Sequence, residues 1–264
     1  MIVLIGHGYV GTHIAEELEM KRLPFVWISH EEKVPVCTNV IINAAGYTGV
    51  PNVDSCETHK QDCIDGNVLW PLLLEQSNPH TPIVHISSGC VYTGHKEGGY
   101  TELDQPNFDF DNGSFYSGSK ALAQRLLLPY MHKSWLLRIR MPFGRKRHSK
   151  NFLTKLETYP KLIDFENSLS CVEDVARTAV RFALERPWFG IYNVVNPGSA
   201  TTRQIADMMG LNKPWFTQSE FAQAVQAPRS NCVLNSQKLQ RVAAITPLDY
   251  TLKSVIDSYR AGQS

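Results

Sequence analysis

The chain begins with MIVLIGHGYVGTHIAEELEMKR, residues 1–22, and this stretch decides the fold. Residues 1–5 form a short, continuous apolar run, as expected for a strand that is buried on both faces of a parallel sheet. Three glycines in the order GxGxxG follow, and apolar residues then recur at helical spacing. The stretch therefore predicts a strand, a glycine turn and a helix, which is the context that a dinucleotide-binding unit requires.

Each glycine of this turn has a separate expected role. Gly6 allows the tight turn, Gly8 lets a pyrophosphate approach the backbone, and Gly11 lets the helix pack on the strand. The helix N-terminus then faces the phosphates with its partial positive charge. We expect Tyr9 and Val10, which lie between these glycines, to complete this part of a cofactor site.

The rest of the chain continues the alternation of strands and helices. Strand-like runs are expected at residues 25–29, 39–46, 83–88, 134–142 and 190–197, and helical patterns at 66–76, 116–131, 170–186 and 251–260. This order favours an α/β fold, a Rossmann-type doubly wound parallel sheet with a smaller C-terminal substrate-binding lobe. We expect residues 1–144 with 168–198 to form the NADP-binding Rossmann domain, and residues 145–167 with 199–264 the nucleotide-sugar-binding lobe.

The connection after the second strand is short. Only about ten residues join residues 25–29 to the next strand, which is barely enough for a parallel crossover, so we expect no full helix there. The second strand ends at Ser29 and His30 without the carboxylate that usually binds the ribose of NAD. This favours NADPH, with His30 or Lys33 near the 2′-phosphate, and leaves NADH as the alternative.

Composition excludes several classes of function. The chain has 264 residues, 43% of them hydrophobic, and a net charge of +1, so it can build a core and carries no electrostatic footprint for nucleic acid. The opening apolar run is too short for a signal peptide, and no run approaches the ~18 residues of a membrane span. The six cysteines form no CxxC pair, so we expect reduced thiols, no metal, and a soluble, cytoplasmic protein.

A second group of residues carries chemistry. Tyr116 and Lys120 are four residues apart on a predicted helix, so both side chains lie on one face. A phenol has a pKa near ~10 and is a weak acid–base catalyst until an ammonium group lowers that pKa. Lys120 can provide this charge and can also hold a ribose, and Ser88 at the end of a strand can hydrogen-bond the same carbonyl oxygen.

Together with Asn43-Ala44-Ala45-Gly46, these residues resemble the extended short-chain dehydrogenase/reductase superfamily. A narrower match covers nearly the whole chain. It rests on the stretches NAAGYTGVPNVDSCETHK (43–60), SGCVY (88–92), PNFDFDNGSFYSGSKA (106–121), LRIRMP (137–142), NFLTKL (151–156) and APRSN (227–231). These are similar to the bifunctional UDP-4-keto-6-deoxyglucose 3,5-epimerase/4-reductase family, which makes UDP-L-rhamnose, and more distantly to dTDP-4-dehydrorhamnose reductases.

The resemblance implies two further catalytic residues. In that family a cysteine and a lysine exchange the protons at C3 and C5, and the matching positions are Cys90 and Lys155. Both protons are α to the C4 carbonyl, so a base can remove them through an enolate whose charge Ser88 and Tyr116 would stabilise. A free thiol, with a pKa of ~8.5, needs only modest lowering to act as this base.

The expected binding residues follow from the same comparison. The cofactor would contact Gly6, Gly8, Tyr9, Val10, Gly11, Ser29, His30, Asn43, Ala44, Ala45, Gly46, Tyr116, Lys120 and Met141. The substrate, UDP-4-keto-6-deoxyglucose or a related nucleotide sugar, would contact Thr48, Ser88, Cys90, Asn151, Lys155, Arg229 and Asn231. Arg229 is expected at the phosphates. A homodimer through the helix that carries Tyr116 is an analogy with the superfamily.

Two alternatives stay open at this point. One is a simple 4-keto sugar-nucleotide reductase that acts after a separate epimerase, in which case Cys90 is a small buried packing residue. The other is a non-catalytic regulatory subunit of the same fold, although the intact Tyr-x-x-x-Lys pair argues against it. Four further cysteines are assigned to packing: Cys56, Cys63, Cys171 and Cys232.

Overall fold

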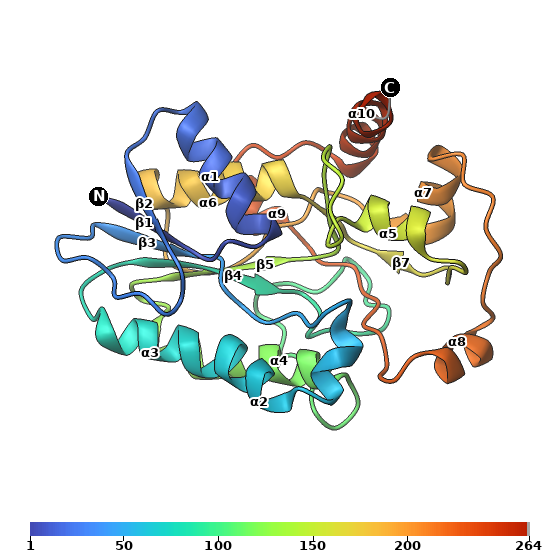
Figure 1. The fold of residues 1–264 in the computed structure, drawn as a ribbon, viewed down its shortest axis with the longest axis horizontal. Helices are drawn as coiled ribbons and strands as arrows, with labels where there is room; N and C mark the ends of the chain where they lie inside the picture. Colours follow the sequence, from blue (N-terminus) through green and yellow to red (C-terminus); the bar gives the residue numbers. More distant parts are fainter. Residues whose placement is uncertain (263–264) are drawn as a thin grey trace.

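The computed structural model describes residues 1–262 and contains one six-stranded parallel sheet in the order β2-β1-β3-β4-β5-β9 (Figure 1). The strands are β1 (Ile2–Ile5), β2 (Phe25–Ile28), β3 (Val40–Asn43), β4 (Ile83–Ser88), β5 (Trp135–Ile139) and β9 (Gly190–Asn193). All five neighbouring pairs are parallel. This confirms the predicted fold class, and the order reverses between β1 and β3, where open α/β sheets bind their ligands.

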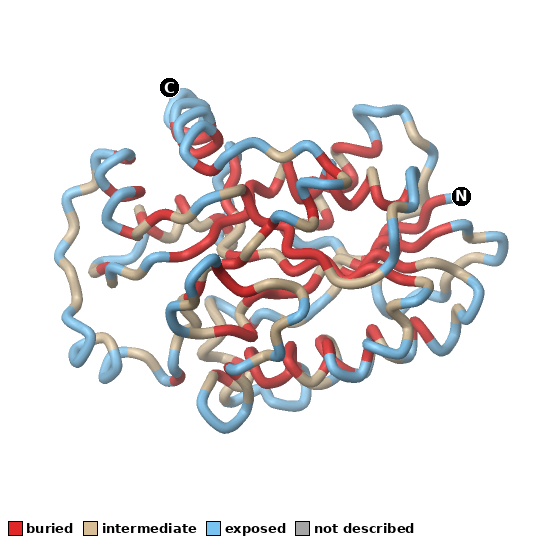
Figure 2. The backbone as a smooth tube through the Cα atoms, turned by 180° about the vertical axis from the view of Figure 1, so that it is seen from behind, coloured by how far each residue is buried: buried red, intermediate tan, exposed pale blue. Residues whose placement is uncertain are grey.

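Helices cover both faces of this sheet (Figure 1). On one face lie α1 (Tyr9–Met20) and α6 (Val172–Glu185), which contact each other along their length, with the short α9 (Gln237–Gln240) beside them. On the other face lie η1 (Val53–Glu57), α2 (Lys60–Ile64), α3 (Trp70–Ser77), α4 (Phe115–Leu127) and η3 (Leu128–Tyr130). A single π-helical turn, η2 (Asp65–Leu69), joins α2 to α3. The inner strands β1 and β3 are consequently buried along their whole length, as their unbroken apolar runs predicted, whereas residues 25–27 of the edge strand β2 are only partly buried (Figure 2).

The connection between β2 and β3 contains no helix, as its length predicted. Residues 29–39 cross β1 as turns and extended chain, and most of them are exposed. The face of the sheet over this connection is therefore covered more thinly than the rest.

A second hydrophobic cluster lies beyond the carboxyl ends of the strands. It is built by β6 (Pro142–Phe143), α5 (Phe152–Thr158), β8 (Ser170–Cys171), β10 (Ala200–Thr201), α7 (Thr202–Met208) and α10 (Leu248–Ala261), with β7 (Glu166–Asn167) and α8 (Gln218–Ala224) at its edge. The cluster also draws on β6 and β8, which belong to residues assigned to the Rossmann domain, while Leu239 and Ala243, near the C-terminus, pack into the core of the large sheet. We keep the two-lobe division as a proposal, with residues 232–245 shared between the lobes.

None of the helices within residues 1–262 combines the length and the apolar character that crossing a bilayer requires.

Candidate active site

The glycine turn lies at the switch point of the sheet, between β1 and the chain that leaves β3. Gly6 has a φ of +102°, and a Cβ atom there would lie 2.6 Å from the backbone nitrogen of Ala45. A Cβ on Gly11 would lie 2.1 Å from the carbonyl oxygen of Gly6. Both positions therefore require glycine, Gly6 for its conformation and Gly11 for the close packing of α1 on the turn.

Gly8 stands in open space at the N-terminus of α1. A Cβ there would meet no atom within 4 Å, no side chain caps the helix, and the first turn of α1 holds no acidic residue. The N–H groups of this turn are thus free for an anion. The side chain of Tyr9 points away from this opening and stacks on His148, with ring centroids 4.7 Å apart, so Tyr9 offers the opening its backbone only.

A carboxylate, that of Glu32, lies at the end of β2, although Glu32 comes three residues after Ser29 in the sequence. The Glu32 carboxylate folds back and accepts a hydrogen bond of 2.7 Å from the backbone N–H of Ser29. This hydrogen bond lowers the pKa of Glu32, which is fully exposed. His30 is also exposed and meets the edge of Trp70. The adenosine end of the predicted cofactor site therefore holds both an exposed histidine and a carboxylate.

The segment after β3 is held by two buried amides. Asn43 accepts a hydrogen bond from the backbone of Ala45, 3.2 Å away. Asn67 both donates to the carbonyl of Tyr47 and accepts from its N–H, at 2.9 and 3.0 Å. Asn67 lies in the π-helical turn, and such turns often occur at functional sites. No pattern in the sequence predicts this turn. These bonds position the loop around Gly46 beside the end of α4.

Tyr116 and Lys120 lie on the buried face of α4, next to the end of β4. Burial raises the pKa of the Tyr116 phenol, the neighbouring Cys90 adds to the effect, and the Ser88 hydroxyl beside the phenol opposes it. The Lys120 Nζ lies 6.0 Å from the centre of the Tyr116 ring and 3.2 Å from where a Cβ on Gly46 would be. The predicted trio is thus assembled in one place.

Lys120 is held in an unfavourable environment. Its side chain is only 8% exposed, and burial lowers the pKa of its ammonium group to about 8, an effect that nearby cysteines, Cys63 first among them, partly oppose. A charged amine without a carboxylate partner in such a place costs folding free energy. This is the pattern of a group retained for chemistry rather than for stability.

We expect Lys120→Met to raise the melting temperature of the free protein at pH 7 by a few degrees, on the order of 2 kcal/mol. The unfolded lysine, with a pKa of ~10.4, binds more protons than the folded one between pH 8 and 10.5, so wild-type stability rises with pH through that window. The gain from Lys120→Met should accordingly be full below pH 8 and shrink toward pH 10.5. Thermal unfolding across this range checks it, with the exposed Lys253→Met as control; an unchanged or lower melting temperature at pH 7 contradicts it.

Cys90 and Lys155, which come from the two lobes, lie close enough for the charge of one to affect the other. The backbone N–H of Cys90 donates to the Ser88 hydroxyl, at 3.0 Å, and the sulfur interacts electrostatically with both Tyr116 and Lys155. Burial lowers the pKa of Lys155 to about 8, and the neighbouring Lys150 lowers it further. Two residues that are 65 positions apart in the sequence are therefore brought to one site, next to the phenol.

Asn151 positions the helix that carries Lys155. Its side chain is fully buried, accepts from the N–H of Leu153, and donates to the carbonyls of Gly144 and Lys146 at 2.8 Å each. Its oxygen caps α5 and its NH₂ group holds the preceding loop, so both ends of the buried amide are engaged within the protein. Asn151 therefore has a structural role in this protein, and its predicted contact with the substrate stays a prediction.

The other predicted substrate residues lie around the same opening. Arg229 forms a two-pronged ion pair with Asp54 of η1, both distances being 2.7 Å, and so bridges the two lobes. Asn231 accepts from the Thr93 hydroxyl at 3.1 Å, and Thr48 is exposed. Met141, which follows β5, has a φ of +39°, a strained conformation for a residue with a side chain. Their contacts with substrate and cofactor stay predictions.

Two cysteines assigned to packing also border the site. Cys56 and Cys63 are fully buried and hydrogen-bond each other. The pKa of Cys63 is lowered, first by the bond from Cys56 and then by bonds from Ser119 and Asn67 and by the charge of Lys120. Their burial is compatible with the packing assignment, but no spacing in the sequence indicated that they would pack against Tyr116.

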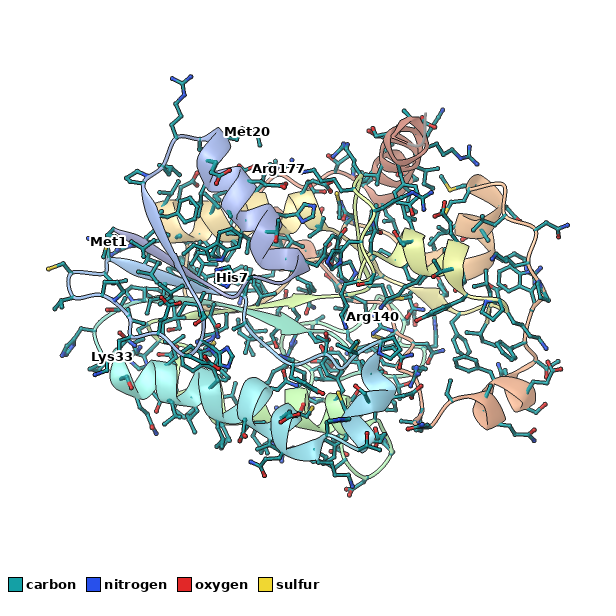
Figure 3. The ribbon with its side chains drawn as sticks, in the orientation of Figure 1. Met1, His7, Met20, Lys33, Arg140 and Arg177 are labelled. Carbon is teal, nitrogen blue, oxygen red and sulfur yellow. The ribbon has the colours of Figure 1, made fainter. Side chains whose placement is uncertain are left out.

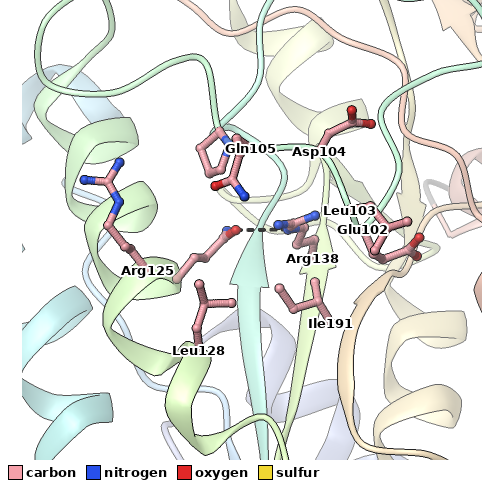
Figure 4. A pocket seen from close by; sticks show the side chains of 10 residues that line it. Glu102, Leu103, Asp104, Gln105, Arg125, Leu128, Arg138 and Ile191 are labelled. Atoms are coloured by element: carbon pink, nitrogen blue, oxygen red, sulfur yellow. Dashed lines mark hydrogen bonds between the residues drawn. The ribbon is translucent and has the colours of Figure 1, made fainter.

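A pocket outside this site is lined by residues of α4, β5 and β9 and by the loop of residues 102–106 (Figure 4). In it the Arg138 guanidinium donates to the side chain of Gln124 at 2.9 Å, as the dashed line shows. No residue of the predicted site lines it. Within the described residues, no cluster of three or more histidine, cysteine, aspartate or glutamate side chains could hold a metal ion.

Known proteins resemble this chain in sequence and in fold. The sequence model of the RmlD substrate-binding domain family matches residues 28–261. The chain belongs to this family. The bifunctional dTDP-4-dehydrorhamnose 3,5-epimerase/dTDP-4-dehydrorhamnose reductase of Arabidopsis thaliana is 36% identical over 76% of this chain and 70% of its own length. The family resemblance drawn from the motifs is thereby confirmed, and the chain is an enzyme of the RmlD-type reductase family.

A trifunctional relative shows how this unit is used elsewhere. The Arabidopsis thaliana UDP-glucose 4,6-dehydratase/UDP-4-keto-6-deoxy-D-glucose 3,5-epimerase/UDP-4-keto-L-rhamnose-reductase RHM3 is 34% identical over 89% of this chain, which spans 38% of that relative's length. Among solved structures, the L780 UDP-rhamnose synthase of Acanthamoeba polyphaga mimivirus has a TM-score of 0.89 at 22% identity, covering 98% of this chain and 99% of that one. The dTDP-4-dehydrorhamnose reductase of Bacillus anthracis in complex with NADP has a TM-score of 0.82 at 17% identity, with 99% and 98% covered. At these identities both structures show the fold alone.

Proposed function

We propose that this chain epimerises C3 and C5 of UDP-4-keto-6-deoxy-D-glucose and then reduces C4 with NADPH, forming UDP-L-rhamnose. The observation that carries the proposal is the convergence of Cys90 and Lys155 on the Ser88–Tyr116–Lys120 group. A reductase alone needs the last three residues. The additional thiol and ammonium are what proton exchange beside a carbonyl requires, and both Arabidopsis thaliana relatives are named as 3,5-epimerases as well as reductases.

The residues present fit a nicotinamide dinucleotide. The open space at Gly8 and the uncapped N-terminus of α1 suit a pyrophosphate, and Lys120 beside Gly46 suits a ribose. The cofactor, when bound, supplies the hydride for C4. NADPH is favoured over NADH, although the Glu32 carboxylate folds back onto Ser29, because the exposed His30 and Lys33 also follow β2 and because a structural relative holds NADP.

Epimerisation follows from the side chains alone. The Cys90 thiolate removes the proton α to the C4 carbonyl and becomes a thiol, the electron pair of the C–H bond forms the C=C bond of the enolate, and the carbonyl π pair moves to the C4 oxygen. Ser88 and Tyr116 donate hydrogen bonds to this enolate oxygen. The Lys155 ammonium group then gives a proton to the opposite face of the same carbon, and the enolate electron pair forms the new C–H bond. Solvent exchange restores both groups.

Reduction uses the same oxygen contacts. Tyr116 protonates O4 as the carbonyl is reduced, Ser88 holds that oxygen, and Lys120 supplies the charge that makes the phenol a competent acid. One carbonyl-binding group thus serves both steps.

The testing experiment separates the two activities. The protein is incubated with UDP-4-keto-6-deoxyglucose in D₂O without NADPH, and deuterium at C3 and C5 is measured by mass spectrometry. NADPH or NADH is then added and the sugar nucleotide is identified, with the dTDP substrate in parallel. We expect deuterium at both carbons and UDP-L-rhamnose with NADPH. Reduction without deuterium incorporation would leave a monofunctional reductase, and absence of both would leave a non-catalytic subunit.

The lowered pKa of Lys155 predicts how the rate of epimerisation falls at high pH, the alkaline limb of its pH profile. A pKa of about 8 for Lys155 means that the ammonium acid is present below that pH and lost above it. Deuterium incorporation should therefore fall as pH rises through about 8. Lys155→Arg, whose guanidinium keeps its proton, should react more slowly and lack this limb. Rates measured from pH 6 to 10 check this, and a limb that persists unchanged in Lys155→Arg would assign it to another group.

A further inference from the structure

The buried residue Arg140 has no role in the function described so far. It follows β5, is 1% exposed, and lies at the centre of the molecule, where the sheet meets the smaller lobe (Figure 3). Its backbone is clamped on both sides by Ser170, whose hydroxyl accepts from the N–H of Arg140 and whose N–H donates to the carbonyl of Arg140. A guanidinium group in such a place needs strong compensation for the loss of water.

The hydrogen bonds of Arg140 fix its guanidinium in one orientation. Nη2 donates to the side-chain oxygen of Asn167 and, at 2.7 Å, to the carbonyl of Ser230. Nη1 donates to the hydroxyl of Ser230 at 2.9 Å and to the sulfur of Cys90 at 3.2 Å. The Ser230 hydroxyl spends its own hydrogen on the carbonyl of Tyr92, so it can only accept from Arg140.

The charge of Arg140 is not balanced by these partners. Within residues 1–262, no carboxylate forms an ion pair with it. Two of its three partner residues, Ser230 and Asn167, cannot become anions. Its Nε is buried and lacks any hydrogen-bond partner. Cys90 is the one group bonded to the guanidinium that can acquire a negative charge, and a charged sulfur is also the better acceptor.

We propose that Arg140 is the positioning residue for Cys90: it aims the sulfur and holds it as a thiolate, ready to remove the α proton. This inference rests on the proposed function, and deepens it by naming what activates the base. Arg140 does not touch the substrate in this arrangement, because it lies beneath Cys90, which is itself only partly exposed. Lys155, on the other side, is left free to act as the acid.

The test follows the alkylation of Cys90 by iodoacetamide, read peptide by peptide by mass spectrometry from pH 5.5 to 10. In Arg140→Met we expect the Cys90 rate at pH 7 to fall about tenfold or more, with the high-pH plateau kept, because only the thiolate reacts. Arg140→Lys should restore part of the rate. The exposed Cys37 serves as an internal reference within each sample.

The matched control is Arg138→Met. Arg138 lies two residues earlier, is equally buried, and bonds Gln124 and the face of Tyr92 rather than Cys90. Its loss should leave Cys90 alkylation within about twofold. A pH profile of Cys90 that is the same in Arg140→Met and in the wild type would overturn the proposal, as would an equal change in Arg138→Met.

A second measurement needs no arginine variant, in case Arg140→Met does not fold. Thiolate absorbance at 240 nm is compared between the wild type and Cys90→Ala at pH 7, so that the other cysteines cancel. An excess of about one thiolate in the wild type supports the inference, and no excess overturns it. The proposed function fails separately: it is lost if Cys90→Ala still exchanges C3 and C5 protons, whatever Arg140 does.

Discussion

Replacing Tyr116 by phenylalanine should lower NADPH-dependent reduction of the 4-keto sugar by about 10²–10⁴-fold, the usual contribution of a positioned acid. The phenol lies beside the Ser88 hydroxyl, and in the proposed mechanism it protonates O4 as the carbonyl is reduced. Because the aromatic ring stays, packing against the neighbouring Cys56 and Cys63 is retained. The rate of NADPH oxidation, measured at saturating substrate, checks this.

The control for this variant is Tyr92→Phe. Tyr92 is also a buried tyrosine, but its hydroxyl donates to the carbonyl of Asp104 and not toward Ser88. Tyr92→Phe should lower the stability of the protein but leave the rate of reduction unchanged. A Tyr116→Phe enzyme with wild-type turnover would remove the phenol from the mechanism.

Replacing Cys90 by alanine should reduce deuterium incorporation at C3 and C5 by at least about 10²-fold, since the base for both positions is gone. Reduction of a substrate that has already been epimerised should remain within a few-fold of the wild type, because the Ser88–Tyr116–Lys120 group is untouched. Mass spectrometry of the recovered keto sugar and NADPH oxidation give the two readouts from one preparation.

Cys232→Ala is the matched control for that experiment. Cys232 is a buried thiol near the same strand end, and its sulfur bonds the carbonyl of Gly89. It should leave both activities in place. Parallel loss of exchange and of reduction in Cys90→Ala would instead mean that Cys90 supports the architecture of the site, and the reductase-only interpretation would then hold.

Much of the fold was predictable because its signals are local. The first 22 residues contain an apolar run, a glycine turn and a helical repeat, and each of these depends on neighbours a few positions away. The same applies to the missing helix after β2, which follows from the length of the connection. Tyr116 and Lys120 could be paired for a similar reason, since a spacing of four places them on one helix face.

The surroundings of those residues were not predictable in the same way. Nothing in the sequence showed that Arg229 would pair with Asp54, 175 positions away, or that Asn151 would be consumed in capping α5. The π-helical turn that aims Asn67 at Tyr47 was equally invisible. The second strand ends without a carboxylate in the sequence, but the chain folds the Glu32 side chain back onto Ser29 at that end.

By itself, the sequence determined the parallel sheet, the glycine turn at Gly6 and the identities of Ser88, Cys90, Tyr116 and Lys120 as candidates for chemistry. Only the tertiary structure decided what surrounds the Cys90 sulfur. Arg140 reaches it because β4 and β5 pair in parallel, with Ser88 opposite Ile139, so that the residues following both strands leave the sheet side by side. That contact joins positions 50 apart, and its geometry comes from strand register, which spacing along the chain does not encode.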